Sequence, residues 1–367
     1  MVPMNEVPKD AEELISLAEV DKNIADLDDD GRVRVLRKQL ANLQKKLIEK
    51  ETGRDLLKSS FDEAYSDPIQ VKGDISYKSS GRSSREEVAV AHLSDVHFGK
   101  RTESYGIEVA ESRVRMFAAK VLQQTDIRRS FAKIKYLRVY LGGDMVEGDG
   151  GIFPGQNFEM DSDIITQAIK TGPEIIADCI LTWLKNFDKI HISGVPGNHG
   201  RSGKFKDKRL NYDSLFYDTL RRMVGLAIPE EHHSRVTWDL PFDRHSDRAW
   251  YSIDNIYGWG TMMVHGHQIR GMLGFPWYGV GKKVAGWIDV IPEPWNYLFM
   301  GHFHTDAKFV INRRLILANG TTETSNAYAA ESMAASGEPV QRLCFFDKSH
   351  GLIVDSPIYL SDREPVA

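Results

Sequence analysis

The chain has 367 residues, a length that is typical of about two domains. Of these residues 41% are hydrophobic and 10% aromatic, which is enough to form a substantial buried core. Its formal net charge is -5, which excludes a globally basic nucleic-acid-binding protein but is compatible with local basic patches. The two cysteines, Cys179 and Cys344, lie far apart, which excludes a disulfide framework and favours a reducing, cytoplasmic compartment.

Residues 1–66 are predicted to form a helical arm. The N-terminus does not resemble a signal peptide, and no stretch approaches the ~18 apolar residues of a membrane span, so we expect no membrane association. Apolar residues recur at helical spacing from 14 to 27. A heptad seam follows, made of Val33, Leu36, Leu40, Leu43 and Leu47. The acidic run at 28–31 is expected to separate two helices, giving a helical hairpin or coiled-coil arm. Its narrow apolar stripe should pack on the main domain, a second copy in a homodimer, or a partner protein.

The same acidic run resembles the start of an EF-hand calcium loop. The twelfth position of such a loop supplies a bidentate Glu, but Arg37 stands there. We therefore interpret the run as a solvated turn.

Residues 67–85 are polar and rich in Ser and Gly, which predicts a linker. Residues 86–367 then alternate short apolar runs with helical patterns. Strands are predicted near 88–91, 137–141, 190–192, 236–240, 261–264, 297–300, 308–311, 315–317, 342–346 and 352–359, and helices at 107–123 and 160–186. This order predicts an α/β domain in which two mixed β-sheets pack together and helices flank them.

Side chains that bind metal ions follow several predicted strands at the points where those strands end. They are Asp95 and His97 in HLSDVHFG, Asp144 in LGGDMVEGDG, Asn198 in GVPGNHG, His265 in TMMVHGH, and His302 and His304 in LFMGHFH. Ligands gather at strand ends in α/β sheets, and side chains two apart on an extended segment point the same way. Oxygen and imidazole donors without thiolate suit Mn, Fe or Zn. With one shared carboxylate, two ions could sit about 3.5–4 Å apart.

The order of these blocks, D-x-H, GD, GNH, an isolated His and GHxH, resembles that of the calcineurin-like metallophosphoesterases over residues 86–360. The resemblance implies that Asp95, His97 and His304 hold one metal ion, that Asn198, His265 and His302 hold a second, and that Asp144 bridges both. His199 would be the acid that protonates the leaving oxygen, oriented by an acidic neighbour. A metal-bridging hydroxide would attack phosphorus in line. We expect two divalent ions, Mn first, with Fe or Zn as alternatives.

Several residues around this site have more than one interpretation. His265 and His267 flank a glycine, and either could be the ligand; we prefer His265 and give His267 a substrate contact as its alternative role. The run at 201–209, RSGKFKDKR, holds five basic residues against one acid. Arg201 and Lys204 would contact a phosphate-rich substrate and Phe205 would stack on a base, although a solvated surface loop is an equal alternative. Four large aromatic residues lie between His267 and His302 in the sequence. They either line a substrate cleft or belong to the core, where large aromatic side chains are found more often: Trp277, Tyr278, Trp287 and Trp295.

The predicted site indicates phosphoester hydrolysis. We favour a phosphodiesterase or nuclease acting on DNA or RNA, because the blocks resemble the repair-nuclease branch of the family. Only 63 residues follow His304, too few for the C-terminal cap of that branch. A phosphomonoesterase acting on a protein, nucleotide or small molecule is the alternative, and it suits the acidic net charge better. A catalytically inert interaction module is a third hypothesis, and the intact ligand set argues against it.

Overall fold

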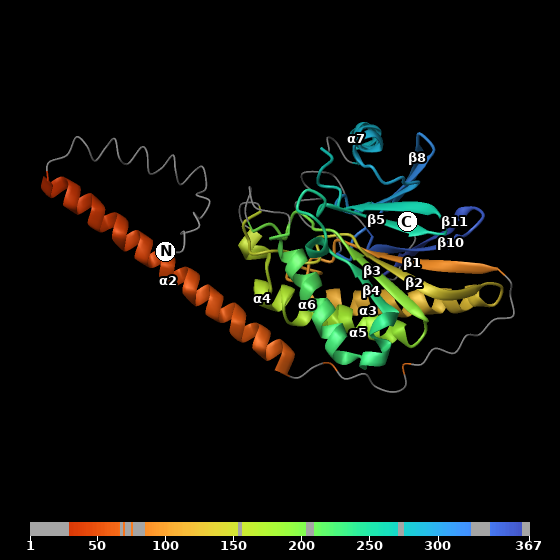
Figure 1. Ribbon diagram of the computed structural model, residues 1–367, viewed down its shortest axis with the longest axis horizontal. Helices are drawn as coiled ribbons and strands as arrows, with labels where there is room; N and C mark the ends of the chain where they lie inside the picture. The colour runs from red at the N-terminus through yellow and green to blue at the C-terminus, as the bar shows by residue number, and fades with distance from the viewer. Residues whose placement is uncertain are drawn as a thin grey trace, which may run out of the picture. The chain divides into compact units, whose positions relative to one another are not determined.

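The computed structural model describes residues 29–66, 69, 75, 85–152, 156–202, 209–270, 275–323 and 338–361. The chain divides into two compact units, residues 1–62 and 63–367, and Figure 1 labels most of the helices and strands. Most of the predicted linker, the expected helix upstream of residue 28, and both Lys204 and Phe205 lie outside the described residues.

Helix α2 (Asp29–Ser66) is the described part of the predicted arm, and at 1.5 Å per residue it is about 57 Å long. Its helical prediction is confirmed. Asp29 and Asp30 belong to the first turn of α2, so this part of the acidic run is helical rather than a separator between helices. Three seam residues, Leu40, Leu43 and Leu47, are 57%, 59% and 56% exposed.

The first sheet has six strands in the order β11-β10-β1-β2-β3-β4. Their bounds are β1 (Glu86–Leu93), β2 (Lys133–Leu141), β3 (Lys189–Gly194), β4 (Val236–Asp239), β10 (Val340–Asp347) and β11 (Gly351–Tyr359). The strands from β1 to β4 are parallel, whereas β10 runs antiparallel to both β1 and β11. The carboxyl ends of the parallel strands therefore meet at one edge.

The second sheet has five strands in the order β5-β6-β7-β9-β8. Their bounds are β5 (Tyr251–Ile256), β6 (Trp259–Val264), β7 (Tyr297–Met300), β8 (Ala307–Ile311) and β9 (Arg314–Ala318). Strands β6, β7 and β9 are parallel, and β5 and β8 pair antiparallel at the two edges. This sheet is therefore mixed, like the first.

The core between the sheets follows from the two-residue period of the strands. Val88 and Val90 of β1 pack against Phe299 and Phe346 between the sheets. The intervening Ala89, like the other alternate residues of β1, belongs to the core under the helices. Successive side chains point to opposite faces, so a strand that is apolar throughout is buried on both faces.

Helices cover both outer faces of the pair of sheets (Figure 1). Helices α3 (Ile107–Arg129), α4 (Ile164–Ala168), α5 (Thr171–Leu184) and α6 (Tyr212–Ala227) pack on the first sheet, and α7 (Trp277–Val290) packs on the second. Short 3-10 helices are η1 (Gln156–Glu159), η2 (Glu230–Arg235) and η3 (Pro241–Asp243). The predicted architecture of two packed mixed sheets flanked by helices is confirmed. Among the described residues, no helix combines the length and the apolar character that a membrane crossing requires.

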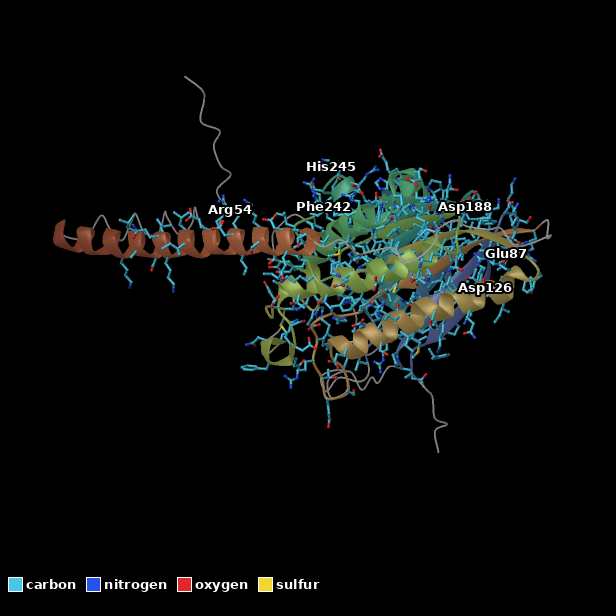
Figure 2. All side chains as sticks on the ribbon, turned by 90° about the horizontal axis from the view of Figure 1, so that it is seen from below. Arg54, Glu87, Asp126, Asp188, Phe242 and His245 are labelled. Atoms are coloured by element: carbon cyan, nitrogen blue, oxygen red, sulfur yellow. The ribbon has the colours of Figure 1, made fainter. Side chains whose placement is uncertain are left out.

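A buried ion pair joins the helical layer to the first sheet. Figure 2 views that layer and labels Glu87 on β1 and Asp126 near the end of α3. The carboxylate of Glu87 is buried and accepts from Arg128 Nε at 2.7 Å and Nη2 at 2.9 Å. The bidentate geometry fixes the end of α3 over the start of β1.

The structure departs from the sequence prediction at several elements. The helix predicted at 160–186 is divided into α4 and α5. Pro173 explains the new start, because it is the third residue of α5, where a backbone N–H has no partner within the helix. Strand β5 and helices α6 and α7 were not predicted. In α6 the signal was present, since Phe216, Leu220 and Val224 recur every four residues on one buried face.

Candidate metal centre

The seven predicted metal ligands lie just beyond strand ends, and the two sheets bring those ends together. Asp95 and His97 follow β1, Asp144 follows β2, Asn198 follows β3, His265 follows β6, and His302 and His304 follow β7. Two compact groups of Asp and His side chains result, each drawing on both sheets. Such edges are where ligand sites form in α/β sheets.

Five of these residues have a left-handed backbone. The angle φ is 54° at Asp95, 52° at His97, 49° at Asp144, 73° at His302 and 49° at His304. This conformation costs a residue with a side chain about 1–3 kcal/mol and persists only where the surroundings enforce it. Hydrogen bonds between the loops hold two of the five residues, because Asp95 N–H donates to Gly143 O and His97 N–H to Asp144 O, each at 3.0 Å. Strain of this kind concentrates at functional sites.

The first cluster consists of Asp95, His97 and His304, whose ligand atoms lie within 4.8 Å of one another. His304 Nε2 is 3.3 Å from Asp95 Oδ1 and 3.2 Å from His97 Nε2. The other nitrogen of each ring faces a buried carboxylate: His97 Nδ1 is 2.7 Å from Glu147, and His304 Nδ1 is 2.8 Å from Glu323. These carboxylates favour the tautomer whose Nε2 lone pair faces the cluster, as in histidines that bind metal ions.

The second cluster consists of Asp144, His265 and His302, again with ligand atoms within 4.8 Å of one another. His265 Nε2 lies 2.9 Å from Asp144 Oδ2 and 3.1 Å from Asn198 Oδ1. Its Nδ1 donates to the backbone carbonyl of Gly142 at 2.8 Å. The donor set of both clusters, carboxylate, amide and imidazole, fits divalent transition-metal ions.

His267 lies beside the second cluster but outside it. Its ring centroid is 5.5 Å from that of His265 and 6.4 Å from that of His302. Its Nδ1 is buried and has no hydrogen-bond partner among the residues that the structure describes. Burial, His265 and Arg201 lower the pKa of His267 to about 2, so the ring is neutral. The geometry favours His265 over His267 as the ligand.

The electrostatics of the clusters favour charged carboxylates. Burial alone would raise the pKa of Asp144, but His265 and His199 outweigh it and hold the pKa well below the ordinary value. Burial would likewise raise the pKa of Asp95, and His304 and His265 lower it. Both side chains are therefore anionic acceptors at neutral pH.

His199 stands at the side of the first cluster, and its ring centroid lies 4.6 Å from that of His97. Its Nδ1 is 3.2 Å from Glu147, which is the acidic neighbour that we expected without naming it. The other Glu147 oxygen accepts from Gln156 Nε2 at 2.7 Å, so the carboxylate is held on both sides. Glu147 stands three residues after Asp144, a position that the sequence displayed but that our interpretation did not use.

A buried carboxylate that we did not predict anchors the loops of the second cluster. Asp213, at the start of α6, accepts backbone N–H groups from Asp144 and Met145 at 3.0 Å and from Gly197 at 2.7 Å. The loops approach so closely that a Cβ at Gly197 would lie 2.1 Å from Asp144 Oδ1. Only glycine fits there, which explains the glycine before Asn198.

Lys100 and Glu323 form a second support that we did not predict. Lys100 Nζ lies 2.7 Å from Glu323 Oε2, and both side chains are buried. Because the other Glu323 oxygen faces His304, the pair connects the loop after β1 with the segment after β9. The two residues lie 223 positions apart, so no local sequence pattern could pair them.

The structure describes only some of the residues that we predicted to contact the substrate. Arg201 is exposed and lies near enough to His267 to lower its pKa, whereas Lys204 and Phe205 lie outside the described residues. Among the aromatic residues, Trp287 and Trp295 are core residues at 7% and 3% exposure, while Trp277 and Tyr278 are 56% and 86% exposed.

The two-sheet sandwich places at one edge the five sequence blocks that resemble those of the calcineurin-like metallophosphoesterases. No family model and no curated protein matches the chain.

Solved structures do match it at low similarity. Vacuolar protein sorting 29 from Cryptosporidium parvum is 14% identical, with a TM-score of 0.36 over 75% of this chain and 99% of that one. An archaeal phosphodiesterase is 9% identical, with a TM-score of 0.35 over 74% and 99%. Vacuolar protein sorting 29 from Entamoeba histolytica, determined with zinc, is 10% identical, with a TM-score of 0.35 over 74% and 99%. At these values the function must be argued from the side chains.

Proposed function

We propose that the protein is a two-metal-dependent phosphoester hydrolase. The observation that carries this proposal is the pair of adjacent Asp and His clusters at one edge of the sandwich. Asp95, His97 and His304 would hold one cation, Asn198, His265 and His302 the other, and Asp144 both. Bound cations supply positive charge to the phosphoryl oxygens and activate a water molecule toward phosphorus. Mn²⁺ is the expected ion, with Fe or Zn as alternatives.

In this proposal His199 delivers a proton to the leaving oxygen. Its Nδ1 faces Glu147 and keeps its own proton, so in the imidazolium form Nε2 carries the second proton, which is the one available for transfer. Burial alone would lower the pKa of His199, but Asp144 and Glu147 reverse that effect and raise it. The protonated ring therefore persists to higher pH and can assist departure of an alkoxide-like group.

We propose a phosphodiester of DNA or RNA as the substrate. The exposed Arg201 beside His267 supports an extended anionic substrate. The net charge of -5 favours the alternative, a phosphomonoesterase. An inert interaction module is less consistent with these residues, because every donor that the site needs is present.

The test is a panel of small esters with the purified protein and Mn²⁺. We expect hydrolysis of bis(p-nitrophenyl) phosphate and cleavage of single-stranded DNA or RNA, with little turnover of p-nitrophenyl phosphate. Hydrolysis of the monoester alone would replace the diesterase by the phosphomonoesterase. No turnover of any ester with Mn, Fe or Zn would favour the inert module.

We also propose that the helical arm joins two copies of the chain in the cytoplasm. The heptad seam of α2 supports the first part, because Leu40, Leu43 and Leu47 are exposed as in an unpaired coiled-coil strand. The two buried free cysteines are consistent with a reducing compartment.

Light scattering on a matched pair of variants tests the arm. Leu43→Lys places a charge in the seam and should convert a dimer to a monomer. Ile48→Lys changes an equally exposed residue outside the seam, at 62% exposure, and should leave the mass unchanged. A wild-type chain that is monomeric would direct attention to a partner protein instead.

A further inference from the structure

A chain of aromatic rings leads away from the second cluster. Phe303 stands between the two candidate ligands of the GHFH block, and its ring centroid is 4.9 Å from that of His302. Phe275 follows at 5.4 Å from Phe303, and Trp277 at 4.6 Å from Phe275. Phe309 of β8 closes the group at 4.7 Å from Trp277. We call Phe303, Phe275, Trp277 and Phe309 the aromatic ladder.

The outer end of the ladder is exposed rather than part of the core. Trp277 is 56% exposed, and its neighbour Tyr278 is 86% exposed. Val280, Val284 and Trp287 make the core contacts of α7. Trp277 lies one turn before Val280 on the same side of the helix, where its ring contacts Phe275 and Phe309 while more than half of the side chain stays exposed. Two adjacent large aromatic side chains exposed beside a candidate site indicate a binding surface, because leaving them in water gains nothing for the fold.

The exposed face of α7 also carries positive charge. Lys282 stands four residues after Tyr278, so the two side chains lie on the same face of the helix, whereas Lys283 lies about 100° further around it. Both lysines are exposed. Two arginines nearby in the sequence or the site are exposed as well, namely Arg270, which precedes α7, and Arg201, which lies near His267. Aromatic rings with interspersed cations are the combination that binds single-stranded nucleic acids, whose bases stack and whose phosphates are anionic.

We propose that the aromatic ladder and Tyr278 form a stacking platform for the unpaired bases of a single-stranded nucleic acid, whose backbone passes His302 into the candidate metal centre. This inference rests on the proposed diesterase function. The occupant is a nucleic acid because the ladder is continuous with the candidate ligand His302 and is accompanied by cations. It is single-stranded because the faces of paired bases are already stacked on one another.

Anisotropy of a fluorescein-labelled 15-nucleotide oligo(dT), measured in EDTA to prevent cleavage, tests the platform. Trp277→Leu and Tyr278→Leu each remove one ring on which a base would stack. From the usual contribution of such stacking to the binding free energy, each substitution should weaken the affinity about 5- to 150-fold. Trp277→Phe and Tyr278→Phe keep a ring and should retain most of the affinity. Val290→Ala changes a residue that is 75% exposed at the other end of α7 and should bind as the wild type does. Unlabelled duplex DNA should compete poorly.

The exposure of both residues makes misfolding of these variants unexpected, and circular dichroism checks it. Leu variants that bind oligo(dT) as tightly as the wild type, or a duplex that competes equally, would overturn the platform. The wild-type protein separates the two proposals. Hydrolysis of bis(p-nitrophenyl) phosphate without oligo(dT) binding contradicts only the platform, whereas oligo(dT) binding that depends on the rings, without hydrolysis of any diester, contradicts only the diesterase.

Discussion

The two candidate metal clusters are built from the same donors but are supported in different ways. In the first, buried carboxylates contact the imidazole rings themselves, Glu147 on His97 and Glu323 on His304. In the second, His265 donates to a backbone carbonyl, and the buried carboxylate of Asp213 contacts the backbone of the loops instead. A carboxylate behind an imidazole increases its basicity as a ligand. The first cluster should therefore bind its cation more tightly, and the second should depend more on loop geometry.

The largest expected effect follows from the residue proposed to join the clusters. Asp144→Asn removes the shared negative charge, and turnover of bis(p-nitrophenyl) phosphate should fall by about a thousandfold or more. The fold should survive, as circular dichroism would show. The control is Asp126→Asn on α3, an exposed carboxylate labelled in Figure 2, which should leave turnover unchanged. Near-normal turnover of Asp144→Asn would refute the proposed metal assignment.

A change behind one ring should affect one cation. Glu323→Gln removes the charge that faces His304, and the affinity of one Mn²⁺ should fall by about 10- to 100-fold while the other changes little. Isothermal titration calorimetry with Mn²⁺ measures both. Glu293→Gln, at an exposed ion pair with Arg248, is the control. If both affinities fell together, the two clusters would not be independently supported.

The support of the second cluster should be visible in stability as well. Asp213→Asn keeps one acceptor oxygen but replaces the other by an amide that faces N–H groups, so unfolding should become easier by about 1–3 kcal/mol. Chemical denaturation measures this change. In a Mn²⁺ titration of Asp213→Asn, the weaker site, which we assign to the second cluster, should lose more affinity than the stronger site. Glu323→Gln should have the opposite effect and weaken mainly the stronger site. An unchanged midpoint would mean that Asp213 is not an anchor.

The smallest effect is expected at the cysteines, since neither cluster uses a thiolate. Burial raises the pKa of Cys179 to about 12, so at pH 8 the group is a protonated thiol. Ellman's reagent should not label it in the folded protein, because the thiolate is the reactive form and the side chain is buried. Cys179→Ala should leave both Mn²⁺ affinities unchanged. Rapid labelling of the native protein would show that this part of the helical layer opens.

Much of the fold was predictable because its central strands contain short runs rich in apolar and β-branched residues, with candidate ligands a few residues after them. The strands around 88–91, 137–141 and 190–192 were found in this way, and the candidate ligands were found with them. Helix α7 was missed because aromatic and glycine residues fill its first turns and the sequence did not distinguish it from a loop. Strand β5 was missed because polar residues interrupt it at Asp254 and Asn255.

The supports of the site were harder to predict than the proposed ligands. Glu147 could have been found, since it lies three residues after Asp144 in the same block. Asp213 could not, because Asp144 is 69 positions away, and neither could the pairing of Glu323 with Lys100, which is 223 positions away; only the folded chain brings these residues together. The roles of Trp277 and Trp287 were also undecided, because side-chain type does not reveal which face of a helix meets the sheet.

The left-handed backbone at five candidate ligands also determines how such a site can be lost. Asn, Asp and His tolerate positive φ better than other residues with side chains. A replacement of Asp95 or His304 by Asn would weaken the site, by removing a negative charge or an imidazole, and keep the loop in place, whereas Ala or Val at the same position would also displace the loop. A descendant that gave up catalysis through Asn could therefore retain the shape of this edge, and with it any surface that a binding partner had come to use.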